Sequence, residues 1–243
     1  MTAPSYAELV TALRREGEGL VAAAGMGLDA EVPACAGWDV RALVDHVSRV
    51  YARIGRIVST RASEQPPAGT EIPAGEPVTV LSELLDELVA ELSDCDPQTP
   101  LWNWSPDAPQ VATFWARRMA QESAVHRFDA QAAHGVMQPI DAELAGDGID
   151  ELIDVIASRV YARDGVTGPT GTIRLQSTDD EAWLIQLEPD GLRRIDAVRD
   201  PDVVVSGTAS ALLLAAYARV PWTSLDITGD AGLLDRWSAA LNF

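Results

Sequence analysis

The chain lacks the residues on which several large classes of function depend. It contains no lysine, so all 18 basic residues are arginine, against 37 acidic residues and a net charge of −19. Nucleic acids and anionic membranes are bound through basic patches, so this balance argues against both as partners. We attribute the missing lysine and the abundant alanine to a high-GC coding bias rather than to chemistry.

Cysteine and long apolar runs are also scarce. The two cysteines, Cys35 and Cys95, do not form a CxxC pair, and a cytoplasmic chain would keep both reduced. The longest apolar stretch, residues 211–218, is far too short to span a bilayer. The first twenty residues carry charges every few positions, unlike a signal peptide. We therefore expect a cytoplasmic protein, and we find no P-loop, GxGxxG or GxSxG motif.

Helical patterns fill the first two thirds of the chain. They cover residues 5–24, 39–62, 79–95, 111–134 and 141–164. Ser5 and Glu8 form a capping box, Asp39 is a typical N-cap, and Gly135 ends the fourth segment. Four long antiparallel helices plus one predict a bundle, and bundles build metal sites from facing helices.

The hydrophobic period changes after Gly165. Residues 171–179, 181–191 and 192–198 are typical of short strands separated by turns. Residues 202–222 and 224–243 then each show a strand, a turn and a helix. The sequence therefore predicts a two-domain α+β protein, with a helical bundle over 1–165 and a small α+β domain over 166–243.

One pair of side chains within this bundle has the residue types and the spacing of metal ligands. Glu122 and His126 are four residues apart in a helical pattern, which places them on one helix face. His46, on the second helix, lies beside the apolar positions Leu43 and Val50. Two imidazoles and one carboxylate leave a fourth position on zinc open, as in catalytic sites. A solvated surface pair and a hydrogen-bonded core histidine are the alternatives, and the pattern alone leaves them open.

Two segments and the C-terminal tail carry a family resemblance. Residues 32–47 (VPACAGWDVRALVDHV) and 117–131 (RRMAQESAVHRFDAQ) resemble the signature segments of the mycothiol-dependent maleylpyruvate isomerase family. Residues 202–241 resemble the C-terminal domain of that family. The resemblance implies a DinB-like four-helix bundle, a sterol-carrier-like α+β domain and an actinobacterial source. Ala36 stands where proline is usual and Gln121 where many members have histidine, but neither change removes a ligand.

The resemblance also implies a chemistry. In the family, the residues that match His46, Glu122 and His126 bind a divalent metal, which we expect to be zinc. Mycothiol would be the thiol cosubstrate, activated as a thiolate that adds to an electrophilic small molecule and isomerises it from cis to trans. The alternatives are a mycothiol S-transferase in detoxification and a non-catalytic binding or regulatory protein. The sequence gives no oligomeric state.

Further residues are weaker candidates. Arg219 matches a position near a basic residue of the family's C-terminal domain, and we expect it to clamp a substrate carboxylate in a site where the two domains meet. Its alternative role is a cation at a helix C-terminus. Asp129 either orients His126 or forms a surface pair with an arginine. Trp102 and Trp104 are expected to pack in their loop rather than to stack on a sugar.

Overall fold

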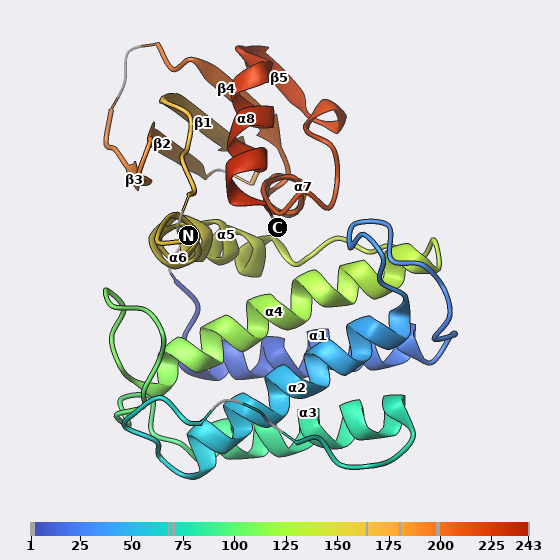
Figure 1. Ribbon diagram of the computed structural model, residues 1–243. Coiled ribbons are helices and arrows are strands. Elements are labelled where there is room, and N and C mark those ends of the chain that lie inside the picture. Colours follow the sequence, from blue (N-terminus) through green and yellow to red (C-terminus); the bar gives the residue numbers. More distant parts are fainter. Residues whose placement is uncertain are drawn as a thin grey trace. The chain divides into compact units, whose positions relative to one another are not determined.

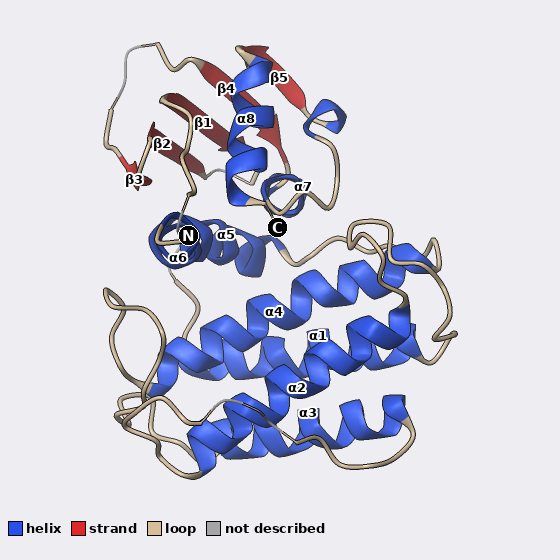
Figure 2. Ribbon diagram, viewed as in Figure 1, coloured by secondary structure: helices blue, strands red, loops and turns tan. Residues whose placement is uncertain are grey.

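The computed structural model describes residues 3–67, 69, 71–163, 165–179, 181–197 and 200–242. The chain divides into two compact units, one spanning Pro4–Gln138 and one that begins at Pro139. Figure 1 traces both units along the sequence, and Figure 2 colours their helices and strands, with the strands in the second unit.

The first unit is a bundle of four long helices. They are α1 (Tyr6–Ala24), α2 (Val40–Ser59), α3 (Pro77–Ser93) and α4 (Ala112–Ala133). The expected start of α1 is confirmed, because the Ser5 hydroxyl accepts from the Glu8 amide and the Glu8 carboxylate accepts from the Ser5 amide. Asp39 caps α2 as expected by accepting from the Ala42 amide at 2.8 Å. Gly135, with φ of 70°, follows the end of α4.

The sequence interpretation assumed that the four helices alternate in direction. That prediction is wrong. Contacts between α1 and α4 pair residues in increasing order, Glu16 with Arg127 and Gly27 with His134, so these two helices run parallel. Helices α2 and α3 both run the opposite way (Figure 1). The connection between α2 and α3, residues 60–76, must therefore return along the bundle. Its proline and glycine content suits an extended crossover, because extended chain covers more than twice the length per residue that a helix does.

The second unit begins with a helical segment that we expected to belong to the bundle. It consists of α5 (Ala142–Glu151), a π-helical turn η1 (Leu152–Ile156) and α6 (Ala157–Tyr161). Asp150 accepts a hydrogen bond from the Trp183 indole at 2.6 Å and also pairs with Arg194, both in the sheet. These contacts explain why the boundary between the units falls near residue 138 rather than near 165.

The sheet has five strands in the order β3-β2-β1-β4-β5. The strands and the elements that follow them are β1 (Gly171–Ser177), β2 (Ala182–Glu188), β3 (Gly191–Arg194), β4 (Val203–Gly207), α7 (Ala209–Ala216), η2 (Trp222–Ser224), β5 (Asp226–Gly229) and α8 (Ala231–Leu241). Among the strand pairs of the described residues, β1–β4 is parallel and the other three are antiparallel. The strand expected over 192–198 stops at Arg194, and Val198 lies outside the described residues.

The predicted α+β fold class, with a helical bundle followed by a sheet domain, is confirmed. Each unit has its own apolar core, which includes Leu13, Leu43 and Leu88 in the bundle and Ile185 and Trp237 in the second unit. Among the helices of the described residues, none is long and apolar enough to cross a membrane.

Candidate metal centre

Helix α4 carries an unusual stripe of buried or half-buried polar side chains. Arg118, Glu122 and His126 follow one another at intervals of four residues, and Asp129 comes three residues later. At these spacings the side chains stack along one face of a helix. Toward the C-terminal end of the stripe the exposed fraction falls, from 9% for His126 to 0% for Asp129. The polar groups must therefore find their partners in the protein, since water has little access.

Helix α2 brings His46 against this stripe. The imidazole Nε2 of His46 and that of His126 both lie 3.3 Å from the same oxygen, Oε1 of Glu122. The two imidazole rings pack in a T-shaped, edge-to-face arrangement, with ring centroids 5.2 Å apart. The three ligand atoms lie within 4.8 Å of one another. This donor set, two neutral nitrogens and one carboxylate oxygen, fits the three protein ligands of an open zinc site.

The remaining atoms of Glu122 and His126 are also engaged. Oε2 of Glu122 accepts from Nη2 of Arg118 at 3.1 Å, and Nδ1 of His126 lies 2.9 Å from Oδ2 of Asp129. A carboxylate on Nδ1 fixes the tautomer in which Nε2 presents its lone pair to a metal. Of the two roles considered for Asp129, the structure supports orientation of His126, since the carboxylate is fully buried.

The electrostatics of the metal-free site favour a proton on His126. Burial alone lowers the pKa of His126, but the charge of Glu122 and the hydrogen bonds to Asp129 and Glu122 outweigh it and raise the pKa to about 9. Burial alone raises the pKa of Glu122, but His126, His46 and Arg118 outweigh it and hold that pKa well below its ordinary value. A metal ion must therefore displace a proton from His126 in order to bind.

Three neighbours position the two helices around the site. The ring of Trp38 lies 5.2 Å from that of His46, and the Cys35 thiol lies 3.9 Å from Oδ2 of Asp129. One turn away, the Tyr51 hydroxyl bonds the Ser123 hydroxyl at 2.6 Å and so joins α2 to α4. Sequence reasoning missed Tyr51 and Arg118. Arg118 could have been found from the spacing of four residues that separates it from Glu122.

His46 lies beside the core, as expected from its place next to the apolar positions of α2. It faces α4, as a ligand must, but 39% of its side chain is exposed, so it lies at the edge of the core rather than within it. This exposure leaves one side of the triad accessible to solvent. An open side is what a site needs if a small molecule is to reach the ion.

The other residues considered from sequence lie elsewhere. Trp102 and Trp104 pack against Trp115 and Phe114 with ring centroids 6.4 and 5.3 Å apart, which supports the expected packing role. Arg219 follows α7 in the second unit, and its Nη1 donates to the Tyr217 carbonyl at 2.8 Å. That bond favours the role of a cation at a helix end, because Tyr217 is the C-cap of α7. The clamp role of Arg219 stays a prediction.

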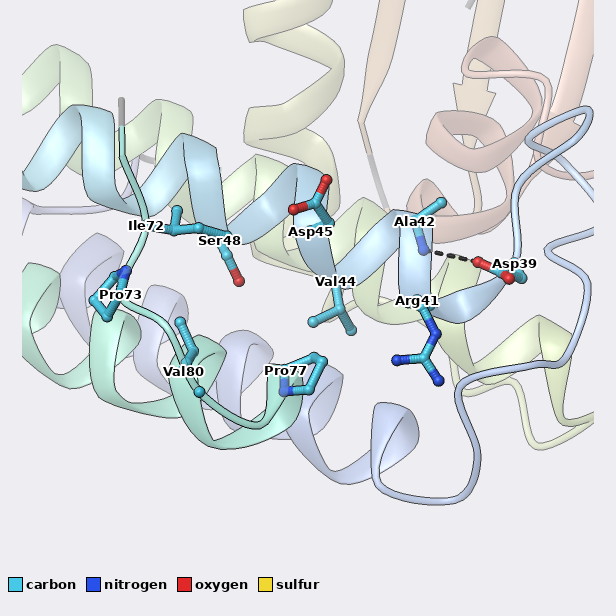
Figure 3. A pocket seen from close by; sticks show the side chains of 11 residues that line it. Asp39, Arg41, Ala42, Val44, Asp45, Ser48, Ile72, Pro73, Pro77 and Val80 are labelled. Atoms are coloured by element: carbon cyan, nitrogen blue, oxygen red, sulfur yellow. Dashed lines mark hydrogen bonds between the residues drawn. The ribbon is translucent and has the colours of Figure 1, made fainter. Parts of the chain in front are cut away.

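A pocket of about 410 Å³ opens on a different face of α2, beneath the crossover loop (Figure 3). Arg41, Asp45 and Ser48 line it from α2. These positions are three or four residues apart and form one face, whereas His46 points to α4 from the other side of the helix. No member of the triad lines this pocket, so it is separate from the candidate metal centre.

Comparisons with known proteins agree with this architecture. The family model for the mycothiol maleylpyruvate isomerase N-terminal domain matches residues 7–131, and that for the MDMPI C-terminal domain matches residues 143–236. The crystal structure of a mutant of the mycothiol-dependent maleylpyruvate isomerase aligns with a TM-score of 0.67 at 13% identity, covering 94% of this chain and 96% of that chain. A second crystal structure of a mycothiol-dependent maleylpyruvate isomerase gives 0.62 at 14% identity, with the same coverage. Among curated proteins, no relative matches.

Proposed function

The chain belongs to the mycothiol maleylpyruvate isomerase family, and on that premise we propose that it is a metal-dependent enzyme that uses mycothiol to isomerise a maleylpyruvate-like substrate. The single observation that carries the proposal is the convergence of His46, Glu122 and His126 on one point, with one side open. We propose zinc as the ion, because two imidazoles and a carboxylate are one of its common catalytic ligand sets.

The protein's own residues determine how such an ion would be held. Asp129 keeps Nδ1 of His126 protonated and so directs Nε2 to the centre of the triad. Arg118 engages Oε2 of Glu122, which leaves Oε1 directed at both imidazoles. Trp38 lies against His46 and limits the rotation of its ring. Three ligands held in this way provide a site that needs little rearrangement when the ion binds.

The ion would supply a Lewis acid that stabilises the thiolate form of the thiol cosubstrate. The thiolate sulfur then adds to a cis carbon–carbon double bond conjugated with a carbonyl, and the electron pair moves to the carbonyl oxygen. The former double bond is now single and can rotate. When the electron pair returns, it expels the sulfur and leaves the trans isomer, so the thiol is regenerated and the reaction is balanced without an oxidant or reductant.

A direct assay tests the proposal. Purified protein loaded with zinc is incubated with mycothiol and maleylpyruvate, and the products are followed by chromatography and mass spectrometry. We expect the trans isomer, turnover that depends on both metal and thiol, and loss of turnover in Glu122→Gln. Glu18→Gln makes the same change on the exposed surface of α1, where 63% of the Glu18 side chain is accessible, and should keep full activity.

Other outcomes would redirect the proposal. Stable adducts of mycothiol with a panel of electrophiles, without isomerisation, would identify an S-transferase. Metal binding without any thiol-dependent turnover would identify a binding or regulatory protein. Protein that contains no metal and binds none added would refute the proposal, because the triad would then be a hydrogen-bonded cluster.

A further inference from the structure

The guanidinium of Arg118 approaches the triad from the side opposite the imidazoles. Its Nη2 donates to Oε2 of Glu122 at 3.1 Å, while Oε1 of the same carboxylate faces His46 and His126. The side chain of Arg118 is 8% exposed, so this bond is shielded from water. Charge-assisted hydrogen bonds in such surroundings are among the stronger ones in proteins.

The two oxygens of Glu122 are thus divided between two tasks. A free carboxylate can bind a metal through one oxygen or through both, and the choice sets the number of positions left for other ligands. With Oε2 engaged by Arg118, only Oε1 is directed at the point where the three ligand atoms converge. Because Arg118 and Glu122 are four residues apart on one helix, the backbone fixes their register.

The charge of Arg118 has a second consequence. Glu122 and Asp129 bring two negative charges to the site, and a divalent ion would balance them without leaving any net attraction for an anion. The guanidinium adds one positive charge beside Glu122. This positive charge offsets part of the negative charge around Glu122, which suits a site that holds one anionic sulfur.

We infer that Arg118 is a positioning residue that restricts Glu122 to binding the metal through Oε1 alone and so keeps a coordination position open for the thiol. The inference rests on the proposed function, since it concerns the same ion. Arg118 touches the carboxylate and not the reacting atoms, so its removal should alter the geometry and affinity of the metal centre and leave the bundle folded.

The test measures metal binding rather than activity. Arg118→Met, which removes the charge and the donors, is loaded with cobalt(II), a spectroscopic substitute for zinc. We expect metal affinity to fall about ten- to a hundredfold, as is typical when a partner of a ligand is lost. We also expect weaker visible absorption bands, because a carboxylate that binds through both oxygens raises the coordination number of the ion. Arg118→Lys, which can still donate to Oε2, should recover most of the affinity and of the absorption.

Controls separate this effect from a change of charge or of folding. Arg49→Met removes the same charge from an exposed side chain on α2, 60% accessible, and should bind cobalt like the wild type. If Arg118→Met does not fold, as judged by circular dichroism, Arg118→Leu, which also removes the charge and the donors, takes its place with the same expectation. A loss of affinity below tenfold, an unchanged spectrum, or a lysine variant as impaired as the methionine variant would overturn the inference. Wild-type protein that binds no metal would overturn the proposed function as well.

Discussion

Metal binding by this protein should depend steeply on pH, because proton and metal compete for His126. The imidazole lies between two carboxylates, Glu122 at 3.3 Å and Asp129 at 2.9 Å, and its pKa in the metal-free protein is raised to about 9. At neutral pH the site therefore holds a proton on Nε2, the atom that must bind the metal. Binding has to release this proton, so apparent affinity should rise as pH rises toward 9.

The magnitude follows from the size of the shift. With a pKa of about 9 for His126, roughly one molecule in a hundred has the deprotonated imidazole at pH 7 and roughly one in ten at pH 8. Apparent affinity should therefore increase about tenfold from pH 7 to pH 8, or about 1.4 kcal/mol per pH unit. Above pH 9 the increase should level off.

Two measurements check this expectation. Competition with a chromophoric chelator at several pH values between 7 and 9 gives the slope, after correction for the chelator's own protonation. Calorimetry in buffers of different ionisation enthalpy gives the number of protons released, which should be close to one at pH 7. An affinity that does not change between pH 7 and pH 8.5, with no proton released, would show that His126 is already neutral and refute the reasoning.

Asp129 offers a matched variant for the same experiment. Asp129→Asn removes one of the charges that raise the pKa of His126 but retains an oxygen that can accept from Nδ1. The levelling of affinity should then occur at lower pH than in the wild type. A pH profile identical to that of the wild type would mean that Asp129 does not contribute to the proton affinity of His126.

Three further expectations can be checked with the same protein. His126→Ala should contain less metal than the wild type by elemental analysis. His134→Ala, which alters the C-cap of α4 outside the triad, should keep its metal. Equal metal content in both variants would exclude His126 as a ligand. Because the folded-state pKa of His126 is raised, its contribution to stability is present below pH 6.5 and is lost as pH rises through about 9. The free energy of unfolding of the metal-free protein should therefore fall by up to about 3 kcal/mol over that range, and its melting temperature by several degrees. A melting temperature that stays constant would contradict this. If Arg219 clamps a substrate carboxylate, Arg219→Lys and Arg219→Ala should lower kcat/KM about ten- to a hundredfold without change in metal content. Normal kinetics in the alanine variant would favour its role as a cation at the end of α7, where it bonds the Tyr217 carbonyl.

Much of the fold was predictable because it depends on local patterns. The caps at Ser5 and Asp39 and the glycine after α4 mark helix ends through hydrogen bonds within a few residues. The direction of the helices was not predictable in this way, because the length of a connection does not say whether it turns back or crosses the bundle. The boundary between the units was missed because it depends on what α5 and α6 pack against, and the partners of Asp150 lie more than thirty residues away.

For the candidate site, the sequence determined which groups of α4 share a face, since the spacing of Glu122 and His126 follows from the helix repeat alone. It also indicated His46 as the third member, through its place beside an apolar face of the second helix. Only the tertiary structure decided that both imidazoles approach the same oxygen of Glu122, and that Arg118 and Asp129 occupy the remaining atoms. Distances between side chains on different helices depend on how the helices pack, and packing is a property of the whole core rather than of any one segment.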